Sequence, residues 1–444
     1  MARSGKNGAV EEVEIGHGGT ARCEGSGEIR ELNGEMRQMA QRLLTGGTVV
    51  DVVTGVAEPK DVLIDGNRIA AVGRADDFGA EPSAERLDVS GKTIVPGLSN
   101  SHVHLGWSGM GWDGGPMGIL RSQALDDSDG INGIKAVANL RKSLRVGLTS
   151  LRDLGMNNSG IDAKTALASG MVKGPRLEIA AKAIMCTGGH TWWCGREADG
   201  PDAVRAAVRE QIKLGADIIK IMASERHPQF TPAELLAAAE ETHLHGKKIT
   251  THATIPAAIR NVVDAGFDSV EHGGPADPDV LETMATRGIM VIPTLSPFMN
   301  QTEIGPSRGM PDDVLAARHV RFAKNPPGKA LVTMREAGIE FAFGTDAGSP
   351  CVEHDVIVPE MENLLKHNVV TSPLEVLRML TINGAKLRGN ADQLGTVEAG
   401  KLADLVVIDG DPLADIGVMR NVVHVFLDGE HLVQEGELRD WYGW

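Results

Sequence analysis

Residues 93–107 read TIVPGLSNSHVHLGW, an apolar run followed by two histidines that are one residue apart. Side chains at positions i and i+2 of a β-strand point to the same face, so His102 and His104 can reach one point in space. Two convergent neutral imidazoles supply half of a tetrahedral metal site. An isolated pair with this spacing also arises by accident. Further ligand-type residues elsewhere in the chain are needed to distinguish a metal site from chance.

Strand-like segments alternate with helical segments from this stretch onward. Apolar residues recur at helical spacing in DAVRAAVREQIKLGA (202–216) and TPAELLAAAEETHLHG (231–246), which predicts amphipathic helices. Eight strands are expected: KTIVPGL, TSLRDLG, LEIAAKAI, ADIIKIM, KKITTHA, DSVEHG, IMVIPTL and EFAFGTDA. Eight βα units around a parallel sheet predict an α/β fold, a (β/α)₈ TIM barrel.

Both ends of the chain have a different sequence pattern, in which short predicted strands alternate with Gly-containing turns. We expect residues 43–97 and 394–444 to pair into one small β-sandwich domain. Residues 98–393 are then the catalytic barrel. Residues 1–42 are Gly-rich and polar and are expected to form an N-terminal extension.

Polar side chains gather at the ends of the predicted strands, where the chemistry of a TIM barrel takes place. They are His102, His104, Asp153, His190, Lys220, His252, His272 and Asp346. Lys220 falls inside the apolar DIIKIM, where burial lowers the pKa of an amine. A neutral amine at this position can react with carbon dioxide.

These motifs resemble a known family. HVH, IIKIMAS, THA, EHGG and FGTDAG, with PGLSN before them and LGTVEAGKLADLVVIDGDP after them, resemble the amidohydrolase superfamily in its two-metal branch with a carboxylated lysine. TSLRDLG, GPRLEIAAKAIMCTGGH and LGADIIKIMAS are most similar to the prolidase, metal-dependent carboxypeptidase and ochratoxin amidohydrolase group.

The resemblance implies two divalent ions, with zinc expected and Co²⁺, Mn²⁺ or Fe²⁺ as alternatives. It implies that His102, His104 and Asp346 bind the more buried ion and that His252 and His272 bind the more exposed one. A carbamate on Lys220 would bridge the two.

The same resemblance implies how the reaction proceeds. A hydroxide shared by the two ions would attack the substrate carbonyl. Asp346 would take its proton and pass it to the leaving nitrogen. His190 in TGGH would hydrogen-bond the reacting carbonyl, with a structural loop histidine as the alternative. Asp153 is expected to orient a neighbouring group.

Several further residues bear on the substrate. Tryptophans 107, 112, 192 and 193 follow strands 1 and 3 and favour an apolar substrate, although packing under the loops is an equal alternative. Arg196 and Arg226 either receive a substrate carboxylate or are solvated. Thr254 stands where peptidase-like relatives often carry a tyrosine.

We therefore expect hydrolysis of a C–N amide bond in a small, partly hydrophobic substrate: an N-acyl amino acid, a dipeptide or a toxin of that shape. The alternative is hydrolysis of a urea, a carbamate or a related xenobiotic at the same site. A non-catalytic barrel protein is the remote alternative.

The composition limits the partners and the location. A net charge of −16 without clustered Lys and Arg argues against nucleic-acid and anionic-membrane partners. Four scattered cysteines, and a first forty residues without the apolar segment of a secretory signal, predict a reduced, cytoplasmic protein. We expect a small-molecule substrate and a homo-oligomer.

Overall fold

The computed structural model describes residues 41–80, 83–110, 118–155 and 157–439. Strands and helices alternate through most of this part of the chain, so the fold is of the mixed α/β class. The described strands form four hydrogen-bonded sheets. Among the described helices, none combines the length and the apolar character that crossing a membrane requires.

Two of the sheets are parallel and hold the predicted central strands. The three-stranded sheet has the order β10 (Arg176–Ile179), β9 (Leu148–Asp153), β8 (Leu98–Val103). The six-stranded sheet has the order β12 (Arg196–Glu197), β11 (Ile184–Met185), β13 (Ile218–Met222), β14 (Lys248–Ala253), β15 (Ser269–His272), β16 (Met290–Ile292).

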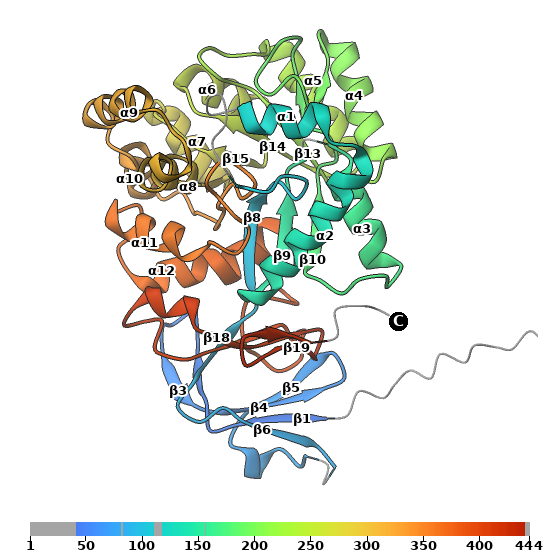
Figure 1. Ribbon diagram of the computed structural model, residues 1–444, viewed down its shortest axis with the longest axis vertical. Helices are drawn as coiled ribbons and strands as arrows, with labels where there is room; N and C mark the ends of the chain where they lie inside the picture. Colours follow the sequence, from blue (N-terminus) through green and yellow to red (C-terminus); the bar gives the residue numbers. More distant parts are fainter. Residues whose placement is uncertain (1–40, 81–82, 111–117, 156, 440–444) are drawn as a thin grey trace, which may run out of the picture. The chain divides into compact units, whose positions relative to one another are not determined.

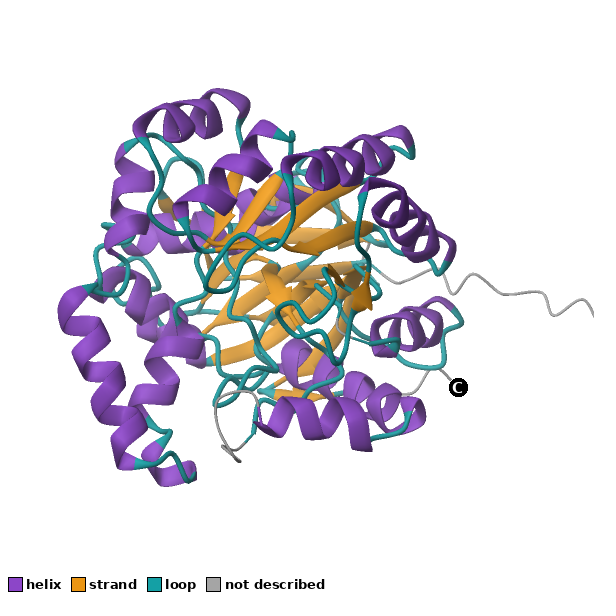
Figure 2. Ribbon diagram, turned by 90° about the horizontal axis from the view of Figure 1, so that it is seen from above, coloured by secondary structure: helices purple, strands orange, loops and turns teal. Residues whose placement is uncertain are grey.

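Single backbone contacts join these two sheets in two places. The N–H of Asp217, just before β13, donates to the carbonyl of Ile179 at the end of β10 (2.8 Å). On the other side, residues 341–347 pair with β16 through Phe341 and with β8 through Ala347. Figure 2 shows the strands in the middle, with the helices arranged around them.

Three of the eight predicted strands differ from the observed ones. The segment TIVP forms β7 (Thr93–Pro96), which pairs with β17 (Leu405–Ile408) in another sheet. The parallel strand β8 begins only after Gly97, where a Cβ atom would lie 2.2 Å from Oγ1 of Thr149.

The other two differences arise at residues with positive φ. LEIAAKAI is divided into β10 and β11, and Ala181 between them has a φ of 55°. EFAFGTDA makes only isolated bridges, and Asp346 within it has a φ of 57°. Left-handed backbone interrupts a strand, and periodicity in the sequence gives no sign of it.

The predicted helices of the βα units are present as α4 (Pro201–Lys213) and α5 (Pro232–Leu244). Thr231 and Glu234 form a capping box that begins α5. The remaining helices are α1 (Gly118–Asp126), α2 (Asp129–Arg145), α3 (Ser159–Ala168), α6 (Pro256–Asp264), α7 (Pro278–Arg287), α8 (Ser296–Glu303), α9 (Asp312–Lys324), α10 (Lys329–Glu336), α11 (Val358–Lys366), α12 (Pro373–Arg378) and α13 (Gly384–Arg388).

The two other sheets combine strands from both ends of the chain. One has the order β5 (Arg68–Gly73), β4 (Asp61–Asp65), β1 (Arg42–Thr45), β6 (Glu85–Asp88). The other has the order β20 (Glu437–Leu438), β19 (Glu430–Gln434), β18 (Val422–Leu427), β17, β7, β2 (Thr48–Val50), β3 (Ala57–Pro59).

One hydrophobic cluster joins these two sheets. Leu44 and Ile64 from the first sheet share it with Ile94, Leu405 and Phe426 from the second, and all five are buried. In Figure 1 the N-terminal strands, in blue, lie beside the C-terminal strands, in red. Strands from the two ends of the chain therefore bury apolar side chains in one cluster, and the β-sandwich domain stays a prediction.

Candidate metal centre

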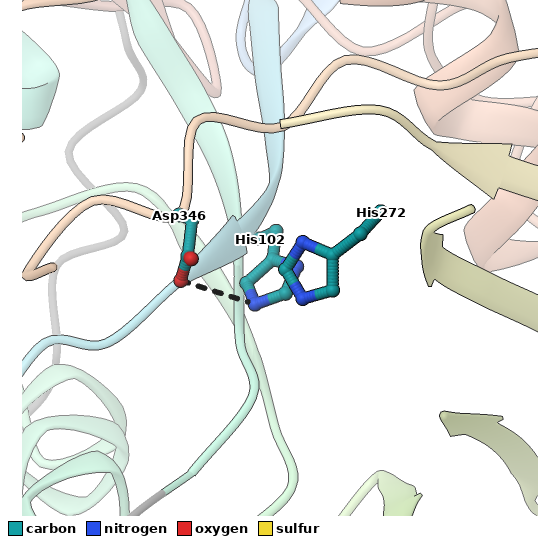
Figure 3. A group of neighbouring side chains, drawn as sticks. All are labelled: His102, His272 and Asp346. Atoms are coloured by element: carbon teal, nitrogen blue, oxygen red, sulfur yellow. Dashed lines mark ion pairs between the residues drawn. The ribbon is translucent and has the colours of Figure 1, made fainter. Parts of the chain in front are cut away.

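Three side chains from distant parts of the sequence bring their ligand atoms together. His102 from β8, His272 from the end of β15 and Asp346 each offer one atom, and these atoms all lie within 4.8 Å of one another (Figure 3). Oδ1 of Asp346 is 3.4 Å from Nε2 of His102 and 3.0 Å from Nε2 of His104. An imidazole and carboxylate set of this kind suits a divalent transition metal.

The other two predicted ligands line the same cavity of about 310 Å³. Lys220 comes from the middle of β13, and His252 comes from β14, the next strand. The ring centroid of His252 is 4.4 Å from that of His272. All six predicted ligands thus reach one space, and the division of the histidines between two ions stays a prediction.

The Nδ1 atoms of three histidines each contact a neighbouring oxygen atom. Nδ1 of His102 lies 2.9 Å from Glu271, Nδ1 of His104 lies 3.1 Å from the carbonyl of Gly155, and Nδ1 of His272 lies 2.6 Å from Oγ1 of Thr294. Contacts of this kind orient a ligating imidazole and set which nitrogen carries the hydrogen.

The His104 contact provides a test of whether a cation fits. A carbonyl oxygen only accepts, so Nδ1 of His104 carries the hydrogen and Nε2 of the neutral ring presents a lone pair. That lone pair faces the Asp346 carboxylate, which also only accepts, at 3.0 Å. Two acceptors this close require a proton or a cation between them, so the residues present fit a metal ion.

Burial favours the neutral forms that metal ligation needs. Burial lowers the pKa of His102, His252 and His272 well below the ordinary value, and neighbouring cationic groups lower it further. Burial also lowers the pKa of Lys220 to about 8, although Glu271 and Asp346 oppose this effect. A lysine with this pKa is partly a free amine near neutral pH.

Comparison with known proteins agrees with this geometry. The profile described as Amidohydrolase family matches residues 93–432. The chain belongs to the amidohydrolase family. The ochratoxinase of Aspergillus niger is 28% identical over 382 residues, which cover 76% of this chain and 75% of the ochratoxinase.

Two solved structures extend the similarity. A prolidase in complex with N-methylphosphonate-L-proline is 30% identical with a TM-score of 0.78, covering 89% of this chain and 100% of the prolidase chain. A Xaa-Pro dipeptidase with methionine bound in its active site is 26% identical with a TM-score of 0.78, covering 88% of this chain and 99% of that one. The resemblance of the sequence motifs to the family is thereby confirmed.

In this amidohydrolase, the other predicted site residues are divided between the cavity and its surroundings. His190 and Thr254 line the cavity, and the His190 ring stacks on His252 with centroids 4.6 Å apart. Asp153 accepts from the backbone N–H of Leu105 (3.3 Å), and burial raises its pKa to about 6. Asp153 thus holds the backbone directly after the HVH motif.

The tryptophans have separate roles. Trp107 is buried and lines the cavity, and Trp193 packs against it with ring centroids 5.8 Å apart. Trp192 is 44% exposed, lies outside the cavity lining and has the guanidinium of Arg121 over its ring. Trp112 lies outside the described residues.

Neither of the two predicted arginines belongs to the described cavity lining. Arg196 pairs with Glu210 at 2.8 Å, and Arg226 is exposed. Arg318 and Arg321 from α9 line the cavity instead, together with Phe298 from α8. Sequence reasoning missed these residues because they follow strand 7 at a distance, and nothing local in α9 indicates the cavity.

A second omission is the buried pair formed by Arg152 and Glu271. Glu271 accepts from Nη2 of Arg152, and Nε of Arg152 donates to the carbonyl of Ser101 (2.7 Å). Both side chains are buried. The signal in the sequence is a cation in TSLRDLG and an anion in DSVEHG, both inside predicted strands, because buried charges occur in pairs.

Proposed function

We propose that this amidohydrolase cleaves the C–N amide bond of a small, partly hydrophobic substrate, such as an N-acyl amino acid, a dipeptide or a toxin of that shape. The observation that carries the proposal is the convergence of His102, His104, Lys220, His252, His272 and Asp346 on one cavity. The similarity to an ochratoxinase and to a prolidase supports the choice of an amide.

We further propose a (β/α)₈ barrel over residues 98–393, a β-sandwich from residues 43–97 and 394–444, and an extension over residues 1–42. The backbone contacts that link the two parallel sheets in two places support the barrel. The cluster shared by the two other sheets supports the sandwich.

The proposed cofactor is a pair of divalent ions, with zinc preferred over cobalt, manganese and iron. His102, His104 and Asp346 would hold one ion, His252 and His272 the other, and a carbamate on Lys220 would connect them. Such ions, when bound, supply an activated water and polarise a carbonyl. In the proposed modification the neutral Lys220 amine forms an N–C bond with carbon dioxide and releases one proton.

The chain's own residues would move the protons. Asp346 accepts a proton from the attacking water and donates it to the leaving nitrogen, because an amine leaves poorly without it. His190 donates a hydrogen bond to the carbonyl oxygen of the substrate as negative charge develops there. Burial lowers the pKa of His190, which keeps this ring neutral with one N–H to donate. Trp107 and Phe298 offer apolar surface to the substrate.

A substrate screen on the zinc-loaded protein tests the proposal. We expect N-acyl amino acids or dipeptides to be hydrolysed, with activity lost on chelation and restored by zinc. Turnover of ureas or carbamates alone would move the function to the alternative. No turnover of any amide, urea or carbamate by protein with two ions bound would favour the non-catalytic alternative.

A further inference from the structure

Two cations from one helix face the cavity that holds the candidate metal centre. Arg318 and Arg321 lie one turn apart on α9, and both line this cavity. Hydrogen bonds from Arg318 to Gln301 and to Phe298 join α9 to α8, the helix that contributes Pro297, Phe298 and Gln301 to the same lining. The proposed hydrolysis as described above assigns no role to either arginine.

Arg318 is positioned by neutral partners. Its Nη2 donates to Oε1 of Gln301 at 2.7 Å, and its Nη1 donates to the carbonyl of Phe298 at 3.3 Å. A guanidinium has five N–H donors, so these two contacts leave donors available. Gln301 and Phe298 therefore orient Arg318 without neutralising it.

Arg321 is also held without a counter-charge. Its guanidinium carbon lies 5.8 Å from the centroid of the Phe298 ring, which leaves the N–H groups at the edge of the guanidinium free of this contact. In the described part of the chain, no ion pair joins Arg318 or Arg321 to a carboxylate. By contrast, Arg308 in the preceding turn pairs with Glu353 at 2.8 Å.

The two charges affect each other. Arg318 is half-buried, which lowers the pKa of its guanidinium, and the positive charge of the more exposed Arg321 lowers this pKa further. Two like charges at the wall of a small cavity are unfavourable, and an anion bound between them relieves both the burial and the repulsion. A carboxylate, the anionic group that an N-acyl amino acid or a dipeptide carries, matches the forked geometry of a guanidinium.

The rest of the lining limits what carries this carboxylate. Trp107, Met222, Pro297, Phe298 and Pro350 supply apolar surface in a cavity of about 310 Å³. The same lining holds the six proposed metal ligands and the two arginines. A matching ligand has an apolar side chain, an amide and a free carboxylate.

We propose that Arg318 and Arg321 bind a free carboxylate of the substrate, which makes N-acyl amino acids and dipeptides preferred over neutral ureas, carbamates and amides. This inference rests on the proposed amide hydrolysis and specifies its substrate class. Because α9, all of whose residues are described, has no buried residue, both arginines can be replaced without disturbing the core.

The test compares two substrates that differ only in charge, N-acetyl-L-phenylalanine and N-acetyl-L-phenylalaninamide, on the zinc-loaded enzyme. We expect kcat/KM for the carboxylate to exceed that for the carboxamide by about tenfold or more, the scale of one charge-assisted hydrogen bond. Arg318→Gln and Arg321→Gln should each remove this preference by raising KM for the carboxylate only. Arg318→Lys should restore part of it.

Lys324→Gln is the matched control, because it removes the same charge from an exposed position of the same helix outside the cavity lining. We expect this variant to keep the wild-type preference. A loss equal to that of Arg321→Gln would mean that only the net charge of α9 matters, and this would overturn the inference.

Other outcomes separate this inference from the proposed function. Equal turnover of both substrates, or a preference retained by the double variant R318Q/R321Q, would overturn the carboxylate site and leave amide hydrolysis intact. If neither substrate is hydrolysed, the wider substrate screen decides amide hydrolysis, and calorimetry of N-acetyl-L-phenylalanine binding to the same proteins decides the arginine site. Binding that is weakened about tenfold in both Gln variants supports the site, and unchanged or absent binding overturns it.

Discussion

His102 depends on two residues that bind no substrate in the proposed reaction. Glu271 accepts from its Nδ1 at 2.9 Å, and Arg152 holds Glu271 through a buried ion pair. This contact fixes Nε2 of His102 toward Asp346. Glu271 is therefore a positioning residue for the metal centre.

Glu271→Gln should weaken metal binding, because a neutral amide no longer enforces the hydrogen on Nδ1 of His102. We expect a loss of about 10- to 100-fold in zinc affinity, measured by competition with a chelating dye. Glu241→Gln is the matched control, since Glu241 on α5 is also buried and pairs at 2.7 Å with Arg209 on α4, outside the cavity. Equal zinc affinity in both variants would show that Glu271 does not position His102 for metal binding.

Asp346→Asn should retain much of its metal and lose about two orders of magnitude or more in kcat, because an amide neither accepts nor delivers the proton. Asp346 has a φ of 57°, a conformation that asparagine also tolerates, so the backbone should survive the change. Steady-state kinetics with metal analysis on the same sample test this. Near-normal turnover in the metal-loaded variant would assign the proton transfer to another group.

At the scale of elements, a carboxylate on α11 holds the start of α8. Glu360 is buried and accepts from the backbone N–H groups of Leu295 (2.8 Å) and Ser296 (2.5 Å) and from Oγ of Ser296 (2.6 Å). Burial raises the pKa of Glu360 to about 7. Phe298 of α8 lines the cavity. The contact between Glu360 and the start of α8 therefore affects both the stability of α8 and the shape of the cavity.

The raised pKa predicts a pH-dependent stability. Glu360 has an ordinary pKa of 4.5, so its contribution is fully present below that pH and is lost as pH rises through about 7. The contribution is on the order of 3 kcal/mol. We expect the free energy of unfolding by urea to fall from pH 5 to pH 8 by more in the wild type than in Glu360→Gln. Parallel pH profiles for the two proteins would contradict this prediction.

The loops that carry tryptophans should determine substrate choice. Replacing Trp107 removes an apolar contact made alike in the ground and transition states, so Trp107→Phe and Trp107→Ala should raise KM for a bulky substrate more than they lower kcat. Trp107→Phe keeps the variant set informative if Trp107→Ala fails to fold. Trp192→Ala is the control, because Trp192 is exposed and outside the cavity lining. Wild-type KM in both Trp107 variants would mean that the Trp107 ring contributes to packing and not to substrate binding.

For the whole molecule, the proposed ligands come from strands spread over most of the sequence. His102 belongs to β8, Lys220 to β13 and Asp346 to the segment that pairs with β8 through Ala347. These residues are distant in the unfolded chain, so metal binding and folding are coupled.

Metal removal should therefore destabilise the whole chain. We expect two ions per chain by elemental analysis and a lower Tm by calorimetry after chelation, restored by zinc. At a free ion concentration 1,000 times the Kd, one site contributes about 4 kcal/mol. Full activity with a single ion, or a Tm that chelation leaves unchanged, would contradict a binuclear centre.

The sequence by itself determined the features that depend on neighbours along the chain. Apolar periodicity predicted α4 and α5, and the rule that parallel strands end at one edge brought the six proposed metal ligands to one place. The helices follow from a local repeat, since the direction of a side chain on a helix is set within a few residues. The common place of the ligands follows from the expected arrangement of parallel strands.

Only the tertiary structure decided the features that depend on contacts across the chain. Strand β8 begins at Leu98, directly after Gly97, where close packing against Thr149 leaves no room for a Cβ atom. Arg318 reaches the cavity because Glu360 holds α8, and α8 in turn holds Arg318 through Gln301. A contact between distant segments depends on how whole elements pack. The periodicity of one segment does not indicate which other segment it will contact.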